Sequence, residues 1–124
     1  MIQDPNAAGN PEQFLAAAFQ RKPEKVVALD VRGLTAYADT IIIITATSAR
    51  QVTAIAEHIY IEMKKQKIMP LGTEGIKEGT WALLDFSDVL IHVFDRESNA
   101  FYDLEGLWAD APRLDISSFE SLDI

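Results

Sequence analysis

Cysteine is absent from the 124-residue chain, which rules out disulfide-stapled folds and metal sites built on thiolates. Long apolar runs are missing as well. Membrane-spanning helices need roughly 18 or more consecutive apolar residues, so we expect no contact with a membrane. The segment 1–10, MIQDPNAAGN, has neither a basic region nor an apolar stretch, so it does not look like a secretory signal. These absences lead us to expect a cytoplasmic protein.

Positive charge is scarce in the last third of the chain. Residues 81–124 carry two basic and ten acidic side chains, and 2 − 10 = −8 equals the net charge of the whole protein. Such a chain brings few cations to phosphate groups and gains little from counterion release, so we expect little direct contact with RNA. On electrostatic grounds, a basic protein is the better partner.

The length favours a single domain with its own hydrophobic core. Composition divides the chain into three parts. We expect an N-terminal tail over residues 1–10, an α/β domain over 11–112, and a weakly held acidic C-terminal tail over 113–124.

Two helices are predicted in the first half of the domain. Asn10 and Pro11 suit the start of a short helix whose apolar residues end at Phe19. A longer helix is predicted to begin after Ser48, because Ser48 and Gln51 have the spacing of a capping box. This helix should end at about residue 67. Its apolar face consists of Val52, Ile55, Ala56, Ile59 and Met63.

Strand-forming segments alternate with these helices. The second segment, residues 40–45, contains four consecutive isoleucines, so both of its faces should be buried and it should be a central strand of the sheet. The third contains a proline, which is tolerated at a sheet edge. The last two are joined by a short polar turn and should form a β-hairpin. The five segments are 26–31, 40–45, 69–76, 81–86 and 89–94.

A helical period follows the hairpin. After four polar residues at 95–98, apolar side chains recur at steps of three and four at Phe101, Leu104, Leu107 and Trp108. The order of elements indicates an α/β fold with a mixed β-sheet of about four to five strands flanked by helices. If the second and third strands are parallel, their connection is a right-handed crossover.

Acidic residues within strands raise the possibility of an enzyme. Asp30 and Asp85 lie in apolar strands, where a carboxylate could be catalytic or could simply face solvent. Asp85 and Asp88 are separated by a turn, so they do not form the Asp-x-Asp pair that would hold magnesium on one strand. His58 and His92 have no partner at ligand spacing and are expected to serve in packing. We therefore predict no metal, cofactor or catalytic residue.

The strand 81–86 carries the most informative aromatic residue. Alternation places Trp81, Leu83 and Asp85 on one face. Because Asp85 favours solvent, Trp81 and Leu83 should lie at or near the surface. Two interpretations remain open. Trp81 either completes a small aromatic core or anchors a protein interface, where tryptophan commonly dominates the binding energy.

Segments from most of the domain resemble the ribosomal silencing factor family, RsfS or Iojap-like proteins. They span about residues 11–112. Two positions depart from the family pattern: Ala46 stands where glycine is usual, and residues 98–100 lack the arginine usual before the Phe-Tyr pair. The matching segments are VVALDV at 26–31, TIIIITATS at 40–48, PLGTEG at 70–75, WALLDFSDVLIHVF at 81–94 and FYDLEGLWADAP at 101–112.

The resemblance implies a nucleotidyltransferase-like fold without the catalytic acidic set, and a function other than catalysis. Members of the family bind the large ribosomal subunit through the universal large-subunit ribosomal protein fourteen. They block joining of the small subunit and repress translation under nutrient limitation. The resemblance places Trp81 in the partner surface, with Leu83 and Asp85 as neighbours. The alternatives are a nucleotidyltransferase-type enzyme and a self-associating ribosome assembly factor, which could form a homodimer.

Overall fold

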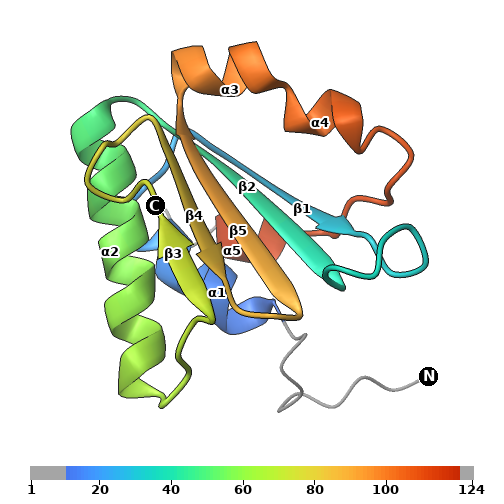
Figure 1. Cartoon of the computed structure of the whole chain (residues 1–124), viewed down its shortest axis with the longest axis horizontal. Coiled ribbons are helices and arrows are strands. Elements are labelled where there is room, and N and C mark those ends of the chain that lie inside the picture. Colours follow the sequence, from blue (N-terminus) through green and yellow to red (C-terminus); the bar gives the residue numbers. More distant parts are fainter. Residues whose placement is uncertain (1–10, 121–124) are drawn as a thin grey trace.

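A five-stranded sheet runs through the structure, a computed structural model that describes residues 11–120. The strands lie in the order β1-β2-β5-β4-β3. β2 and β5 are parallel and the other neighbouring pairs are antiparallel, so the predicted α/β fold with a mixed sheet is confirmed (Figure 1). The strands are β1 (Lys25–Asp30), β2 (Thr40–Ala46), β3 (Gly72–Glu74), β4 (Trp81–Asp85) and β5 (Val89–Asp95).

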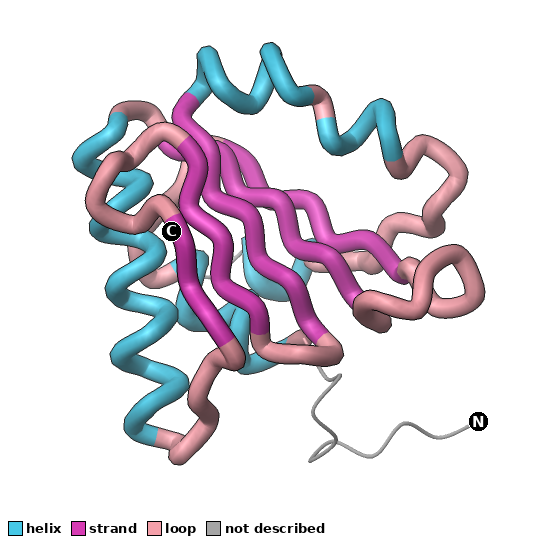
Figure 2. The backbone as a smooth tube through the Cα atoms, in the orientation of Figure 1, coloured by secondary structure: helices cyan, strands magenta, loops and turns pink. Residues whose placement is uncertain are grey.

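The helices divide between the two faces of the sheet. One face is covered by α1, α2 and α5, whereas α3 and α4 follow β5 along the opposite side (Figure 2). Within residues 11–120, no helix is long and apolar enough to cross a bilayer. The helices are α1 (Glu12–Phe19), α2 (Ala49–Lys65), α3 (Arg96–Tyr102), α4 (Leu104–Leu107) and α5 (Ser117–Glu120).

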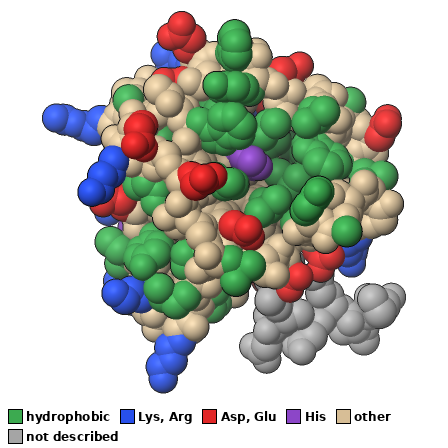
Figure 3. Space-filling view, in the orientation of Figure 1, with side chains coloured by type: hydrophobic (Ala, Val, Ile, Leu, Met, Phe, Trp, Pro, Cys, Tyr) green, Lys and Arg blue, Asp and Glu red, His purple; other side chains and the backbone are tan. Residues whose placement is uncertain are grey.

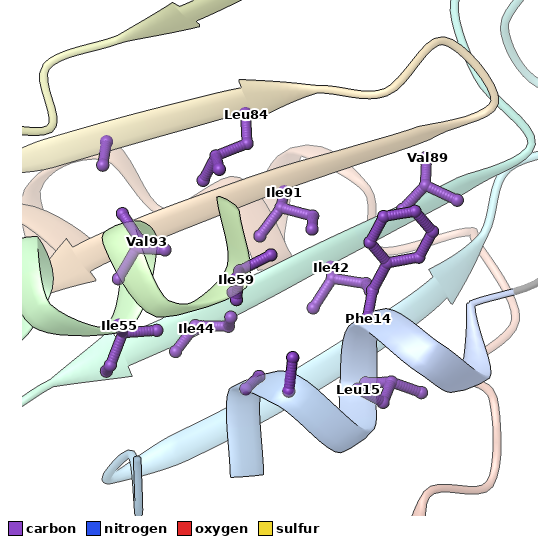
Figure 4. Close-up of a cluster of buried hydrophobic side chains, with 14 of the residues drawn as sticks. Phe14, Leu15, Ile42, Ile44, Ile55, Ile59, Leu84, Val89, Ile91 and Val93 are labelled. Carbon is purple, nitrogen blue, oxygen red and sulfur yellow. The ribbon is translucent and has the colours of Figure 1, made fainter. Parts of the chain in front are cut away.

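The main core lies between α2 and the sheet. The predicted apolar face of α2 is fully buried, and it packs against inward-facing side chains of β2, β4 and β5 (Figure 4). Each large side chain buried here contributes roughly 1.5–3 kcal/mol. The strand residues in this cluster are Ala28, Ile42, Ile44, Ala46, Ala82, Leu84, Val89, Ile91 and Val93.

The start of α2 follows the prediction only in part. The Ser48 hydroxyl accepts a hydrogen bond from the Gln51 backbone N–H at 3.1 Å, as a helix cap requires. The Gln51 side chain does not complete the box by bonding Ser48. Its oxygen accepts from the Thr47 N–H at 2.6 Å, and its amide nitrogen donates to the carbonyls of Arg21 and Lys22. Gln51 therefore ties α2 to the loop that follows α1.

Several boundaries differ from the sequence prediction. α2 ends at Lys65, because Lys67 adopts a left-handed conformation with φ of 64°. β3 is an edge strand as predicted but covers only three residues. β2 and β3 run in the same direction, but β5 and β4 lie between them. The predicted cap Asn10 lies outside the described residues.

The first part of the C-terminal segment is held against the domain. Arg113 forms a β-bridge with Leu29, and the Leu114 N–H donates to the Ala28 carbonyl at 2.8 Å. The rings of Phe119 and Phe19 stack with centroids 6.4 Å apart. The expected weak attachment of the tail is therefore wrong for residues 113–120, because its apolar residues pack on the main core.

Candidate functional site

The sheet face opposite α1 and α2 is covered over only part of its width. Its β1 and β2 side chains are buried beneath Leu104, Trp108 and Ala111. On β4 and β5, by contrast, only Phe94 is buried on this face and the other outward-facing residues stay half-exposed. Figure 3 shows hydrophobic side chains gathered around a histidine on this side of the molecule. We define the open face as Trp81, Leu83, Asp85, Leu90 and His92.

Strand register pairs the open-face residues across the hairpin. Leu83 lies opposite His92, and Asp85 lies opposite Leu90. Residues of β4 alternate between half-exposed and buried, with Trp81, Leu83 and Asp85 on the exposed side. The prediction that these three side chains share one face is confirmed.

Trp81 lies at one end of the open face within an aromatic cluster. Its ring centroid is 5.0 Å from that of Phe94 on β5 and 4.5 Å from that of Tyr102 on α3. Its indole Nε1–H donates to Nδ1 of His92 at 3.0 Å. Trp81 is half-buried. The two interpretations of Trp81 are thus compatible, since one part of the side chain completes an aromatic cluster and another part stays exposed.

The start of α3 brings Tyr102 over Trp81. Asp95, the last residue of β5, caps α3 by accepting the Ser98 N–H at 2.7 Å. The polar residues 95–98 were expected to separate the strand from a later helix. Instead, the helix begins directly at Arg96, because the aspartate satisfies one of its free N–H groups, that of Ser98.

The predicted helical stripe is split by Asp103. This residue adopts a left-handed conformation with φ of 46°, ends α3, and caps α4 through the Gly106 N–H. As a consequence, Phe101 is 79% exposed and Leu107 is 72% exposed. Other residues of the stripe, Leu104 and Trp108, pack on the second core cluster. The prediction of one continuous apolar helix face is wrong.

Carboxylates border the open face on the side of β3. Glu74 on β3 is exposed and lies opposite Leu83 on β4. Asp85 lies one pleat further along β4, and its side chain accepts the Ser87 N–H at 2.9 Å. Figure 3 shows acidic side chains beside the hydrophobic region. The open face is therefore apolar in its middle and negatively charged at this edge.

His92 is neutral under ordinary conditions. Burial lowers the pKa of His92 from 6.5 to about 4. The remaining histidine, His58, lies on α2, where its Nε2 is 2.6 Å from the Gln20 side-chain oxygen. Both histidines are engaged in packing and hydrogen bonding, as expected.

Asp30, Asp85 and Asp88 do not assemble into one site. Asp30 shares the face of Ala28, which packs towards α1 and α2, whereas Asp85 projects from the opposite face. The Arg32 guanidinium is 2.8 Å from the Asp30 carboxylate and lowers the pKa of Asp30. Among residues 11–120, no group of three acidic, histidine or cysteine side chains is arranged to hold a metal ion.

Comparison with known protein families shows to which family the chain belongs. The family described as "Ribosomal silencing factor during starvation" matches residues 5–123. The chain belongs to the ribosomal silencing factor family. Ribosomal silencing factor RsfS from Halalkalibacterium halodurans is 38% identical over 100 residues, which are 81% of this chain and 86% of that protein. The Bacillus subtilis protein of the same name is 38% identical over 101 residues, 82% of this chain and 86% of its own length.

More distant and structural relatives agree with this assignment. The chloroplast protein Iojap of Zea mays is 31% identical over 100 residues, covering 81% of this chain and 43% of that protein. A crystal structure from Chromobacterium violaceum aligns with a TM-score of 0.77 at 32% identity, covering 79% of this chain and 82% of that one. The named RsfS relatives are described as silencing factors and not as enzymes.

Three side chains at this surface were not predicted from the sequence: His92, Tyr102 and Glu74. The hairpin itself held the signal for His92, since pairing residues 81–85 with 90–94 places His92 opposite Leu83. Tyr102 could not be placed, because its position depends on the cap at Asp95. Glu74 depends on the register of a three-residue edge strand, which has little pattern of its own.

Proposed function

We propose that this silencing factor binds the large ribosomal subunit through its open face. The partner is the universal large-subunit ribosomal protein fourteen, and binding blocks the joining of the small subunit and represses translation. The observation that carries this proposal is the apolar region of β4 and β5, which stays half-exposed, whereas every residue of β2 is buried.

Composition of the open face favours a protein partner. Exposed apolar regions rimmed by polar residues mark interaction sites. Trp81 and Tyr102 supply the aromatic anchors that interfaces commonly use. Glu74 and Asp85 at the rim attract a basic surface and repel phosphate groups. A basic ribosomal protein therefore fits this surface better than bare ribosomal RNA does.

Competing functions receive less support. Asp30 and Asp85 lie on opposite faces of the sheet, so no observation favours the nucleotidyltransferase alternative. Self-association through the open face would bring Glu74 and Asp85 of two copies near each other, which opposes pairing by like-charge repulsion. Light scattering of the purified chain checks for the dimer.

Co-sedimentation with separated ribosomal subunits tests the proposal. The parent protein should pellet with large subunits and not with small ones. Leu83→Arg introduces a bulky cation at the middle of the open face, opposite His92, and should lower affinity at least ~10-fold, which corresponds to ~1.4 kcal/mol. Leu34→Arg adds the same charge at a residue that is 50% exposed between β1 and β2, and should bind like the parent.

Leu83 suits this experiment because it lies outside both core clusters of the described residues, so its replacement should leave the folded domain intact. Circular dichroism and thermal melting of both variants provide the check on folding. Equal binding of the parent to large and small subunits would contradict the proposal, as would equal binding by Leu83→Arg and Leu34→Arg.

A further inference from the structure

His92 occupies the middle of the open face. It lies on β5 with Leu83 beside it on β4 and Ile43 beside it on β2. Its neighbours along the same face of β5 are Leu90 and Phe94. A polar side chain in these apolar surroundings needs a hydrogen-bonding role for each ring nitrogen.

One ring nitrogen has its role within the domain. Nδ1 of His92 lies 3.0 Å from the indole Nε1 of Trp81. An indole N–H only donates, so Nδ1 must accept and cannot carry a proton. Burial keeps the pKa of His92 near 4, so the ring is neutral at neutral pH. The single ring proton therefore sits on Nε2.

The other ring nitrogen faces outward. Among residues 11–120, Nε2 of His92 has no hydrogen-bond partner. No side-chain nitrogen or oxygen in this part of the chain is both unpaired and shut off from solvent. His92 is half-buried, so its Nε2–H must reach the surface. Trp81 thus fixes a single outward-pointing donor within the apolar region.

We propose that His92 determines the specificity of the open face by donating its Nε2–H to a carbonyl oxygen of the docked protein. This inference rests on the proposed docking function. A carboxylate acceptor is disfavoured because Glu74 sits beside Leu83 in the same cross-strand row and Asp85 lies on the same face. A neutral carbonyl from the backbone or from an amide side chain meets the donor without repulsion.

The acceptor requirement has a measurable consequence. Docking removes Nε2–H from water, and a buried donor without an acceptor loses the hydrogen bonds that water supplied. A surface that matches the open face in shape but lacks an oxygen at this point is therefore rejected. Trp81 acts here as a positioning residue for His92, in addition to its own exposed contact surface.

Two amide substitutions distinguish the acceptor role of Nδ1 from the donor role of Nε2. Asn Oδ1 is as many bonds from Cα as Nδ1 of histidine, so His92→Asn can still accept from Trp81 but has no outward donor at the position of Nε2. Gln Nε2 is as many bonds from Cα as Nε2 of histidine, so His92→Gln restores an outward donor. A third variant, His92→Phe, keeps an apolar ring and removes both nitrogens.

Binding to isolated large subunits, with the Trp81 indole proton resonance as a monitor of the Nε1–Nδ1 contact, tests the inference. His92→Asn should bind about 10-fold more weakly while the resonance stays hydrogen-bonded, and His92→Phe should be at least as weak. His92→Gln should regain part of the lost affinity. Parent-like binding by either His92→Asn or His92→Phe overturns the inference.

Leu83→Arg distinguishes this inference from the proposed function. If Leu83→Arg weakens binding and His92→Phe does not, docking on the open face stands and the donor role of His92 is wrong. If neither variant weakens binding, the open face is not the docking surface and both proposals fail. If His92→Asn does not fold, His92→Phe and His92→Gln supply the same comparison, with the glutamine expected to bind more tightly.

Discussion

Replacing Trp81 by alanine should affect folding and binding to different extents. Trp81 contacts Phe94 and Tyr102 and donates to His92. Truncating a fully buried aromatic residue costs ~3–5 kcal/mol, and Trp81 is half-buried, so we expect a loss of ~2 kcal/mol in the free energy of unfolding. The broken hydrogen bond adds little, because water reaches Nδ1 once the indole is gone. For a domain of this size, the melting temperature should fall by about 10 °C.

This expectation revises what strand alternation alone suggested. A tryptophan that was simply exposed would leave the melting temperature within a few degrees of the parent. Trp81→Ala should nevertheless stay folded at low temperature, where its affinity for large subunits should drop by ~2 kcal/mol or more, about 30-fold. Sedimentation binding measured well below the melting transition separates the two effects.

Trp108→Ala is the matched control. Trp108 is also half-buried and packs on the same second core cluster as Trp81. It should lose similar stability but keep its affinity for large subunits, because it lies over the β1 and β2 side of the face. Similar losses of affinity in Trp81→Ala and Trp108→Ala would refute the assignment of binding to the open face. A parent-like melting temperature for Trp81→Ala would refute the estimate of its packing.

Two further predictions concern stability. Phe119→Ala should lower the free energy of unfolding by ~2 kcal/mol, because Phe119 stacks on Phe19 and anchors the C-terminal segment. Urea titration measures this change, and an unchanged free energy of unfolding would mean that the segment does not contribute to stability. Burial lowers the pKa of His92 from 6.5 to about 4, so below pH 6.5 the unfolded state binds a proton that the folded state does not. The free energy of unfolding is therefore unaffected by this group above pH 6.5 and falls as pH drops from 6.5 towards 4. Between pH 7 and pH 4, the parent should lose ~2 kcal/mol more than His92→Asn, and equal losses would show that His92 does not resist protonation.

Strong local patterns made most of the fold predictable. The isoleucine run gave the central strand β2, the three- and four-residue spacing gave α2, and the polar turn at 86–88 gave the hairpin. These features depend on burial over several consecutive residues, which leaves a periodic trace in the sequence. The face shared by Trp81 and Asp85 followed from strand alternation alone.

Features set by single hydrogen bonds were not predictable in this way. One carboxylate at Asp95 starts α3, and one left-handed residue at Asp103 splits the helical stripe. Asp103 is both the C-cap of α3 and the N-cap of α4. Nothing in the surrounding sequence distinguishes it from an ordinary surface aspartate. The C-terminal segment looked weakly held because its apolar residues are isolated in the sequence, yet Leu114, Ile116 and Phe119 all pack on the main core.

Ala46 stands where the resemblance to the family led us to expect glycine. It is the last residue of β2, is fully buried, and pairs with Asp95 in the parallel ladder. No left-handed conformation is required there, since Ala46 is not among the residues with positive φ in residues 11–120. Alanine therefore fits this position without strain.

Site-specific photo-crosslinking tests the central claim most directly. A photoreactive amino acid is placed at position 83, in the middle of the open face, or at position 34, in the exposed loop between β1 and β2. Each protein is irradiated with purified large subunits, and the crosslinked component is identified by mass. We predict that position 83 crosslinks to the universal large-subunit ribosomal protein fourteen and position 34 does not. Crosslinking of position 83 mainly to ribosomal RNA or to another protein, or equal crosslinking from both positions, would contradict the account.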